Sequence, residues 1–221
     1  KNHNTSPTIV FILTDDLAYA DLSSYGSEFI NTPHIDKMAN DGVKLTSYYA
    51  AQAVCSASRA AILTGCYPNR LGISGAFGPN SKKGINPDEL LLSEMLKNND
   101  YKTGIFGKWH LGDAEKFMPT NHGFDEFYGI LFSNDMWPYH PEFPGAYPDD
   151  LLLYRNTEPV EALIDQSDLT KNITDESIRF IDENKDNPFF LYIAHPQPHV
   201  PLFASKEFDG STGKGLFADV I

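Results

Sequence analysis

The sequence contains no apolar stretch long enough to cross a membrane. Its longest apolar runs, I-V-F-I-L and F-F-L-Y-I-A, are far shorter than the ~20 residues that a membrane-spanning helix needs. The first residues, K-N-H-N-T-S-P, lack the basic and then apolar pattern of a signal peptide. We therefore expect a soluble globule that is either cytoplasmic or a mature form from which a leader was removed.

Basic residues and cysteines are also few. Seventeen Lys and Arg stand against thirty Asp and Glu, for a formal net charge of -13. This charge disfavours nucleic acid and anionic membranes as partners, so an anionic substrate must be attracted locally. A helix of about ten residues would hold Cys55 and Cys66 roughly 15 Å apart, beyond the ~7 Å limit for a disulfide. We expect two free thiols, which leave the redox compartment open.

What is present is an alternation of strand-like and helix-like segments. We expect strands at 8–13, 43–49, 103–106 and 189–195, and helices at 33–41, 56–64, 87–96 and 169–184. The first strand is an unbroken apolar run, which predicts burial on both faces, and the first helix should turn Ile35, Met38 and Ala39 inward. The alternation predicts one α/β domain with a mainly parallel central sheet flanked by helices on both faces. Residues 113–168, rich in aromatics, proline and glycine, read as a loop-rich insertion.

Polar side chains follow three of the expected strands. Asp15 and Asp16 follow the first, Lys108 and His110 follow T-G-I-F, and the last ends at His195 with His199 just beyond. Ligands bind beyond the carboxyl ends of parallel strands, so we expect these groups to converge.

Each group also has a plainer interpretation. Adjacent aspartates suit calcium or magnesium, but a bare Asp-Asp pair is more often a turn or a helix cap. Lys108 and His110 suit an anionic substrate but also suit a solvated turn. His199, in the stiff segment P-Q-P-H-V-P-L, is either catalytic or structural.

The segment C-S-A-S-R-A-A-I-L-T-G places Cys55 at the start of a helix and Arg59 one turn later. A helix start lowers a thiol pKa and favours anions, although a free cysteine is more often a small buried apolar residue. A cysteine phosphatase would need arginine at position 61, which is alanine. A cysteine protease would need a paired histidine, which spacing alone leaves open.

This segment resembles the sulfatase signature, C-x-P/A-x-R followed by an apolar helix and T-G. Five further segments resemble sulfatase motifs in family order: T-D-D-L-A-Y-A-D-L, T-P-H-I-D-K-M-A-N-D-G-V, G-K-W-H-L-G, G-F-D-E-F-Y-G-I-L-F-S-N-D-M-W-P and P-F-F-L-Y-I-A-H-P-Q-P-H-V-P-L. Together they cover about residues 8 to 202. The chain is thus similar to the N-terminal catalytic part of arylsulfatase A-like enzymes, in the alkaline phosphatase superfamily.

The resemblance implies that Cys55 is a precursor. In sulfatases this cysteine is converted by a maturation enzyme to formylglycine, whose hydrate attacks sulfur, expels the alcohol and then eliminates sulfate. A Ca2+ or Mg2+ ion would be held by Asp15, Asp16 and residue 55. Ala57 stands where many members have proline, and the family pattern allows both.

The resemblance also assigns roles to the other residues. Arg59 and Lys108 would stabilise the diol and sulfate oxygens, and Ser133 would hydrogen-bond the sulfate. His110 would accept the diol proton and His199 would protonate the leaving oxygen. His195 has no firm counterpart and is expected to be structural.

Family members usually continue well beyond this length. Their second metal-binding D-N-G segment, a downstream lysine and a C-terminal subdomain have no counterpart in these 221 residues, so we expect weak metal binding and poor turnover from this segment. The leading hypothesis is a sulfatase acting on sugar or aryl sulfates, exported to a periplasm, cell surface or lysosome. Alternatives are a phosphodiesterase or phosphonate monoester hydrolase of the same superfamily, and a non-catalytic binding product.

Overall fold

The computed structural model describes residues 6–221, and within them a six-stranded sheet forms the centre of the fold. Its strands are β1 Ile9–Leu13, β2 Lys102–Lys108, β3 Glu126–Ile130, β4 Leu152–Arg155, β5 Glu158–Ala162 and β6 Phe189–Ala194. The α-helices are α1 Pro33–Asp41, α2 Cys55–Thr64, α3 Leu92–Lys97, α4 Leu169–Asn184 and α5 Leu216–Val220. Five short 3-10 helices lie at Tyr19–Asp21, Ser23–Tyr25, Pro68–Leu71, Glu115–Phe117 and Pro119–Asn121.

The strand order β1-β6-β2-β3-β4-β5 gives a mainly parallel sheet. The pairs β1–β6, β6–β2 and β2–β3 are parallel, whereas β3–β4 and β4–β5 are antiparallel. The carboxyl ends of four neighbouring strands therefore open onto one edge of the sheet. This is the α/β architecture that the alternation of strands and helices predicted.

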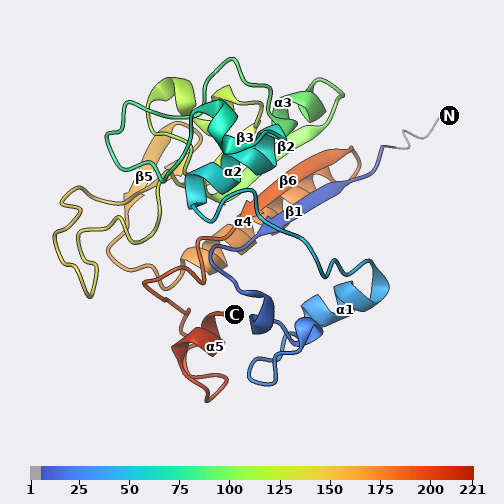
Figure 1. Cartoon of the computed structure of the whole chain (residues 1–221), viewed down its shortest axis with the longest axis vertical. Coiled ribbons are helices and arrows are strands. Elements are labelled where there is room, and N and C mark those ends of the chain that lie inside the picture. Colours follow the sequence, from blue (N-terminus) through green and yellow to red (C-terminus); the bar gives the residue numbers. More distant parts are fainter. Residues whose placement is uncertain (1–5) are drawn as a thin grey trace.

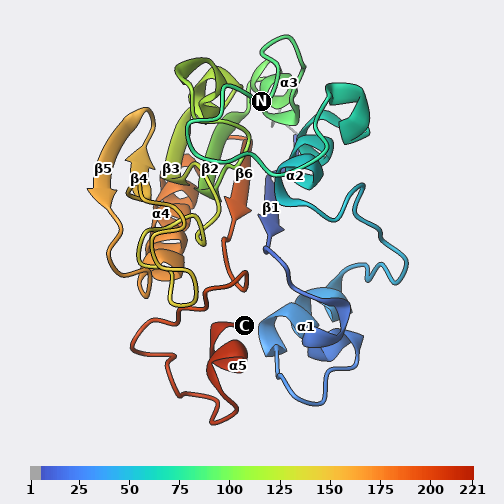
Figure 2. The same cartoon turned by 60° about the vertical axis from the view of Figure 1, so that its left-hand side comes forward.

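Helices cover both faces of the sheet (Figures 1 and 2). On one face, α2 and α3 lie over a core that includes Leu63, Ile105 and Phe190. On the other, α4 packs against β2, β3 and β6 through a second core that includes Ile173 and Phe180. Among residues 6–221, no helix is long and apolar enough to cross a bilayer.

Strand β1 departs from the expectation of burial on both faces. Its side chains alternate between half-buried and exposed, and Val10 and Ile12 are 43% and 50% exposed. Among the described residues β1 pairs only with β6, so it is an edge strand. The unbroken apolar run correctly predicted a strand, but it did not predict that this strand lies at the edge of the sheet.

Several expected elements are confirmed, and others differ. Helix α4, strand β6 and the ends of α1 and α2 at glycines lie where the sequence placed them. However, Ile35 and Met38 of α1 are exposed, because α1 packs mainly on the short helix Ser23–Tyr25 and not on the sheet. The expected helix 87–96 is shortened to α3, because the chain forms a turn at Asn86. The Asn86 carbonyl accepts a hydrogen bond from the Glu89 N–H, and its side-chain oxygen accepts one from the Asp88 N–H.

One strand prediction is wrong, and the loop-rich stretch contains strands that the sequence did not indicate. Residues 43–49 form no strand, and Val43 and Tyr49 are 86% and 84% exposed, because no neighbouring strand pairs with them within the described residues. Conversely, the stretch 113–168 contains β3, β4 and β5. These strands are only four or five residues long, too short for an alternating pattern to be read in sequence. The irregular part of the stretch lies mainly between β3 and β4.

Candidate active site

The predicted residues meet at the carboxyl edge of the sheet. Asp15 and Asp16 follow β1, Lys108 ends β2 and His110 follows it, Ser133 follows β3, and His199 follows β6. Helix α2 adds Cys55 and Arg59 from its first turns. Parallel strands direct their ends to one edge, which brings together residues as far apart in sequence as Asp15 and Lys108.

Buried charges of opposite sign form the centre of the site. The Lys108 ammonium donates a short hydrogen bond to Asp15 Oδ2, and Arg59 NH2 lies 3.4 Å from the same oxygen. The side chain of Lys108 is fully buried and that of Arg59 is 2% exposed. Arg59 NH1 also donates to the Lys108 carbonyl, 2.5 Å away, which fixes the guanidinium against β2.

The two cations decide the protonation state of Asp15. Burial alone would raise the pKa of the Asp15 carboxyl, but the charges of Lys108 and Arg59 outweigh it and hold this pKa below its ordinary value. Asp15 is therefore a carboxylate at neutral pH. Lys108 and Arg59 carry two positive charges against the single negative charge of Asp15, so the centre of the site is locally positive although the net charge of the protein is -13. This local positive charge favours binding of an anion.

Cys55 is the first residue of α2, and its Sγ lies 3.7 Å from Asp15 Oδ1. The expectation of a low thiol pKa is wrong: burial raises the pKa of Cys55, and the Asp15 charge adds to this although Lys108 and Arg59 oppose it. Within the described residues its hydrogen-bond partner is this aspartate and not a histidine. The thiol is therefore neutral at physiological pH and lacks the histidine partner of a cysteine protease.

Ser133 extends the polar site on the side of β3. Its hydroxyl lies 2.8 Å from Lys108 Nζ, from which it accepts a hydrogen bond, and the residue is 2% exposed. Lys108 thus connects Asp15 with Ser133, from the ends of two different strands. A hydroxyl and an ammonium at this separation both present donors to a tetrahedral anion.

His199 and Asp16 form the outer, more exposed side of the site. Nε2 of His199 lies 3.6 Å from Asp16 Oδ2, and the two side chains are 16% and 68% exposed. The other ring nitrogen, Nδ1, lies 2.6 Å from the Val200 carbonyl, to which it donates. This bond leaves Nε2 as the nitrogen that exchanges a proton at the site.

His110 lies deeper than predicted and is fully buried. Its Nε2 donates to the Phe77 carbonyl at 2.8 Å, while Nδ1 is buried without a hydrogen-bond partner in the described chain. Burial, together with the charge of Lys108, lowers the pKa of His110 to about 3. His110 is thus a neutral ring with one bare nitrogen, and no hydrogen bond joins it to Cys55 among the described residues.

The structure adds one positioning residue that the sequence did not reveal. Asn134 is fully buried, and its side-chain amide donates to the carbonyls of His199 and Pro201 at 3.3 and 3.1 Å. It therefore ties the segment that carries His199 to the segment that carries Ser133. Its place beside Ser133 in S-N-D was the only signal available. His195 directly follows β6, and its Nδ1 is buried and unpartnered within the described part.

The described residues supply too few ligands for a complete divalent-cation site. No cluster of three or more His, Cys, Asp or Glu side chains that could hold a metal occurs within residues 6–221. Asp15 is already engaged by Lys108 and Arg59, and Asp16 extends toward solvent and His199. Calcium takes about six to eight oxygen ligands, so these residues do not by themselves fit a complete calcium site.

Comparison with known proteins finds similar sequences and a similar solved structure over nearly the whole chain. The family model described as Sulfatase matches residues 7–216. Arylsulfatase A of Bos taurus is 36% identical over 96% of this chain, and human N-acetylgalactosamine-6-sulfatase is 37% identical over 97%. The solved structure of Ps i-CgsB in complex with k-i-k-neocarrahexaose superposes with a TM-score of 0.85 and 33% identity over 98% of the chain.

The match covers only part of each of these proteins. The chain spans 45% of the bovine sequence, 44% of the human sequence and 52% of the solved structure. It thus corresponds to about half the length of the curated relatives it matches, and to their N-terminal portion.

Proposed function

Because the chain belongs to the sulfatase family, we propose that its site is the sulfate-binding part of an active centre that hydrolyses sulfate esters of sugars or aryl alcohols. The observation that supports this most strongly is the buried group of Lys108, Arg59 and Ser133 beside residue 55. Two buried cations and a hydroxyl stabilise negative charge on sulfate oxygens most effectively where water is excluded.

We propose further that Cys55 is converted to formylglycine by a maturation enzyme. Its thiol is half-buried next to a carboxylate that disfavours the thiolate, so the unmodified residue is a poor nucleophile. After conversion and hydration, an oxygen at position 55 would attack sulfur while the sulfur–oxygen bond to the alcohol breaks. Loss of the proton from the second oxygen then releases sulfate and restores the aldehyde.

The proton-transfer roles go to the two histidines. His199 is partly exposed and its Nε2 is the free nitrogen, so we propose that it protonates the departing alcohol oxygen. His110 carries a bare Nδ1, and we propose that it accepts the proton from the hydrated residue 55. With a pKa of about 3, His110 is unprotonated at working pH, so its Nδ1 is free to accept a hydrogen bond from the hydrated residue.

A calcium or magnesium ion would neutralise charge on the sulfuryl group when bound. In the proposed site, Asp15, Asp16 and modified residue 55 contribute part of its ligands, and further oxygen ligands are required. We expect weak calcium binding by the 221-residue chain for this reason. The partners would then be a sulfated glycan or aryl sulfate and the maturation enzyme. We also propose export to a periplasm, cell surface or lysosome, the usual sites of such enzymes.

Mass spectrometry and a sulfate-release assay test this function together. The peptide that contains Cys55 should lose about 18 Da on conversion to the aldehyde, whereas oxidation of the thiol would add mass. Cys55→Ala should abolish sulfate release from p-nitrophenyl sulfate, and Cys66→Ala, the matched control, should leave it intact. Faster turnover of p-nitrophenyl phosphate or a phosphonate monoester at equal concentration would contradict a sulfatase, as would an unmodified Cys55 in the natural host.

A further inference from the structure

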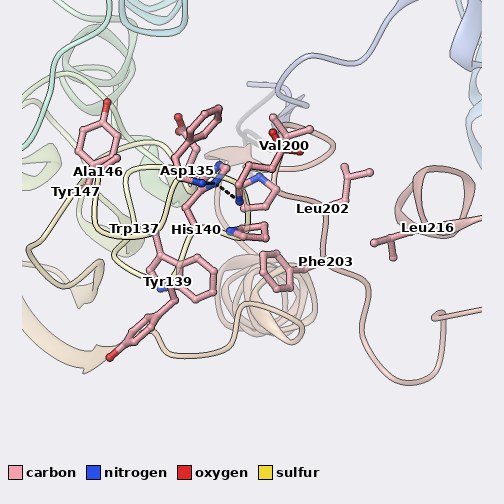
Figure 3. A pocket seen from close by; sticks show the side chains of 14 residues that line it. Asp135, Trp137, Tyr139, His140, Ala146, Tyr147, Val200, Leu202, Phe203 and Leu216 are labelled. Atoms are coloured by element: carbon pink, nitrogen blue, oxygen red, sulfur yellow. Dashed lines mark hydrogen bonds between the residues drawn. The ribbon is translucent and has the colours of Figure 1, made fainter.

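Beside the proposed sulfate site lies a cavity of about 860 Å³ that none of the roles above uses. Its walls come from residues 135–147, directly after Ser133, and from residues 200–203, directly after His199, with Leu216 at the rim (Figure 3). We refer to it as the aromatic pocket. Because its lining begins within two residues of both Ser133 and His199, the pocket adjoins the proposed sulfate site along the chain.

The aromatic pocket contains a packed group of rings. The ring centroids of Trp137 lie 5.5 Å from Tyr139 and 5.6 Å from Phe203 (Figure 3). The indole N–H of Trp137 donates to the Leu163 carbonyl at 2.6 Å, which fixes the ring, and Trp137 is 4% exposed. Tyr139 and Phe143, by contrast, are 54% and 62% exposed. A fixed ring and two exposed rings in the lining of one pocket provide apolar surface for the face of another ring.

Polar groups within the pocket favour a ligand with hydroxyl groups. Asp135 Oδ1 is buried and has no hydrogen-bond partner in the described chain. A buried acceptor of this kind carries a desolvation cost until a donor reaches it. His140 Nδ1 accepts hydrogen bonds from the backbone N–H groups of Glu142 and Phe143, both at 3.1 Å, so the other ring nitrogen, Nε2, carries the N–H. A sugar hydroxyl can donate to the aspartate, whereas a plain aryl group cannot.

The charge of the pocket is opposite to that of the sulfate site. Its acidic lining residues are Asp135 and Glu142, and no Lys or Arg is among the described residues that line it. The sulfate site next to it holds Lys108 and Arg59. A second sulfate group placed in the pocket would face two carboxylates and no cation, so like-charge repulsion would disfavour it.

We propose that the aromatic pocket binds an uncharged sugar ring adjacent to the sulfated one, an inference that rests on the proposed function. Trp137, Tyr139 and Phe143 form the apolar surface for that ring, and Asp135 receives one of its hydroxyls. The pocket thereby selects substrates with a single sulfate at this position over glycans that are sulfated on neighbouring rings.

Binding to the pocket can be measured without catalysis. The chain has two tryptophans, so ¹⁵N-labelled protein gives two indole signals, and Trp137→Phe assigns them. Titration with methyl β-galactoside, which is uncharged, should shift the Trp137 signal saturably, with a midpoint on the order of millimolar, and leave Trp109 unmoved. Tyr139→Ala and Phe143→Ala should weaken this binding several-fold, whereas Tyr49→Ala, an exposed aromatic outside the pocket, should not.

Selectivity is measured with a pair of galactose disaccharides, one with a single sulfate and one with a second sulfate on the neighbouring ring. We expect kcat/KM to be about tenfold lower for the doubly sulfated compound, and the double variant Asp135→Asn, Glu142→Gln to bring the ratio near one. Glu158→Gln, an exposed acid on β5, is the control and should not change the ratio.

The outcomes separate the pocket from the proposed function. Galactoside binding together with an unmodified Cys55 in the natural host would support the pocket and contradict the function. Turnover without any shift of the Trp137 signal would overturn the pocket and leave the function standing. Equal turnover of both disaccharides by the unaltered protein, or tighter binding of benzyl alcohol than of the galactoside, would also overturn the pocket as a site for an uncharged sugar.

Discussion

Lys108 neutralises the charge of Asp15 from a fully buried position, and it also donates a hydrogen bond to Ser133. Lys108→Met keeps the apolar stem and removes the charge, which leaves Arg59 as the remaining Lys or Arg paired with the buried carboxylate among residues 6–221. Removing one partner of a buried pair costs roughly 3–5 kcal/mol, so we expect a loss of that order in the free energy of unfolding, measured in urea. Sulfate affinity should fall at the same time.

Lys97 provides the matched control for that experiment. Its ammonium lies 2.7 Å from Asp125, and its side chain is 46% exposed. A pair so close to solvent contributes less than about 1 kcal/mol, so Lys97→Met should change the free energy of unfolding little. Equal losses in the two variants would contradict the assignment of Lys108 as the compensating charge of Asp15.

His110 and His195 predict a loss of stability in mild acid. Burial lowers the pKa of His110 to about 3, with the charge of Lys108 adding to the effect, and lowers the pKa of His195 to about 4. Both folded values lie below the unfolded value of about 6.5, so the unfolded chain binds more protons and stability falls as the pH drops below 6.5. Between pH 7 and pH 4.5 each ring should cost on the order of 2 kcal/mol.

The variant His195→Gln isolates one of these contributions. Its free energy of unfolding should depend less on pH across the same range, whatever its absolute stability, because glutamine does not titrate. Urea unfolding at five pH values measures the slope. A slope equal to that of the unaltered protein would show that His195 is not held neutral by burial.

At the level of single residues, the sequence predicted the convergence at the sheet edge well. Asp15 and His199 come after strands that are readable as apolar runs, and parallel topology then places the ends of these strands together. Ser133 follows β3, which the sequence did not indicate as a strand, so its place at the site came from the resemblance alone. The raised pKa of Cys55 was not predictable, because it depends on how deeply the start of α2 is buried and on the nearby Asp15. The role of Asn134 likewise depends on a loop that only the folded chain brings within reach.

At the level of elements, Gly107 in β2 determines how closely β2 and β6 approach. Its φ is +120°, and a Cβ there would lie 2.0 Å from the Ala194 carbonyl oxygen. Gly107→Ala must therefore push β2 from β6 and displace Lys108. We expect a loss of at least ~3 kcal/mol in the free energy of unfolding, together with weaker sulfate binding.

Gly210 separates backbone strain from this steric clash. It also has a positive φ, +75°, but a Cβ there would meet nothing within 4 Å. Gly210→Ala should cost only the roughly 1–2 kcal/mol of a left-handed conformation, with sulfate binding unchanged. Similar losses for both variants would show that the close approach of β2 and β6 is not what requires glycine at position 107.

The elements also show which signals in the sequence were reliable. Helix α4 and strands β2 and β6 were predicted because long periodic or unbroken apolar patterns coincide with burial in the structure. Residues 43–49 alternate between apolar and polar side chains as a strand would, yet they have no partner strand in the described chain and are exposed. A pattern in sequence indicates a tendency, and pairing with neighbouring segments decides whether the strand forms.

At the level of the whole molecule, the two edges of the sheet differ in protection. Strand β5 carries Glu158, Pro159 and Glu161, and charges and proline of this kind block pairing with another strand. Strand β1, Ile-Val-Phe-Ile-Leu, carries no charge and no proline and exposes Val10 and Ile12. Exposed apolar side chains continue beyond it in α1 and in residues 43–49. In the described chain, β1 is thus the edge open to association.

We therefore expect the 221-residue chain to self-associate through β1 at concentrations of tens of micromolar, where unprotected edges pair. Ile12→Lys places a charge on this edge and should shift sedimentation toward the monomer. Val160→Lys on β5 is the matched control, because Val160 and Ile12 are 53% and 50% exposed, and it should leave the distribution unchanged since that edge is already blocked. A monomer at all concentrations, or an equal effect of both substitutions, would contradict β1 as the interacting edge.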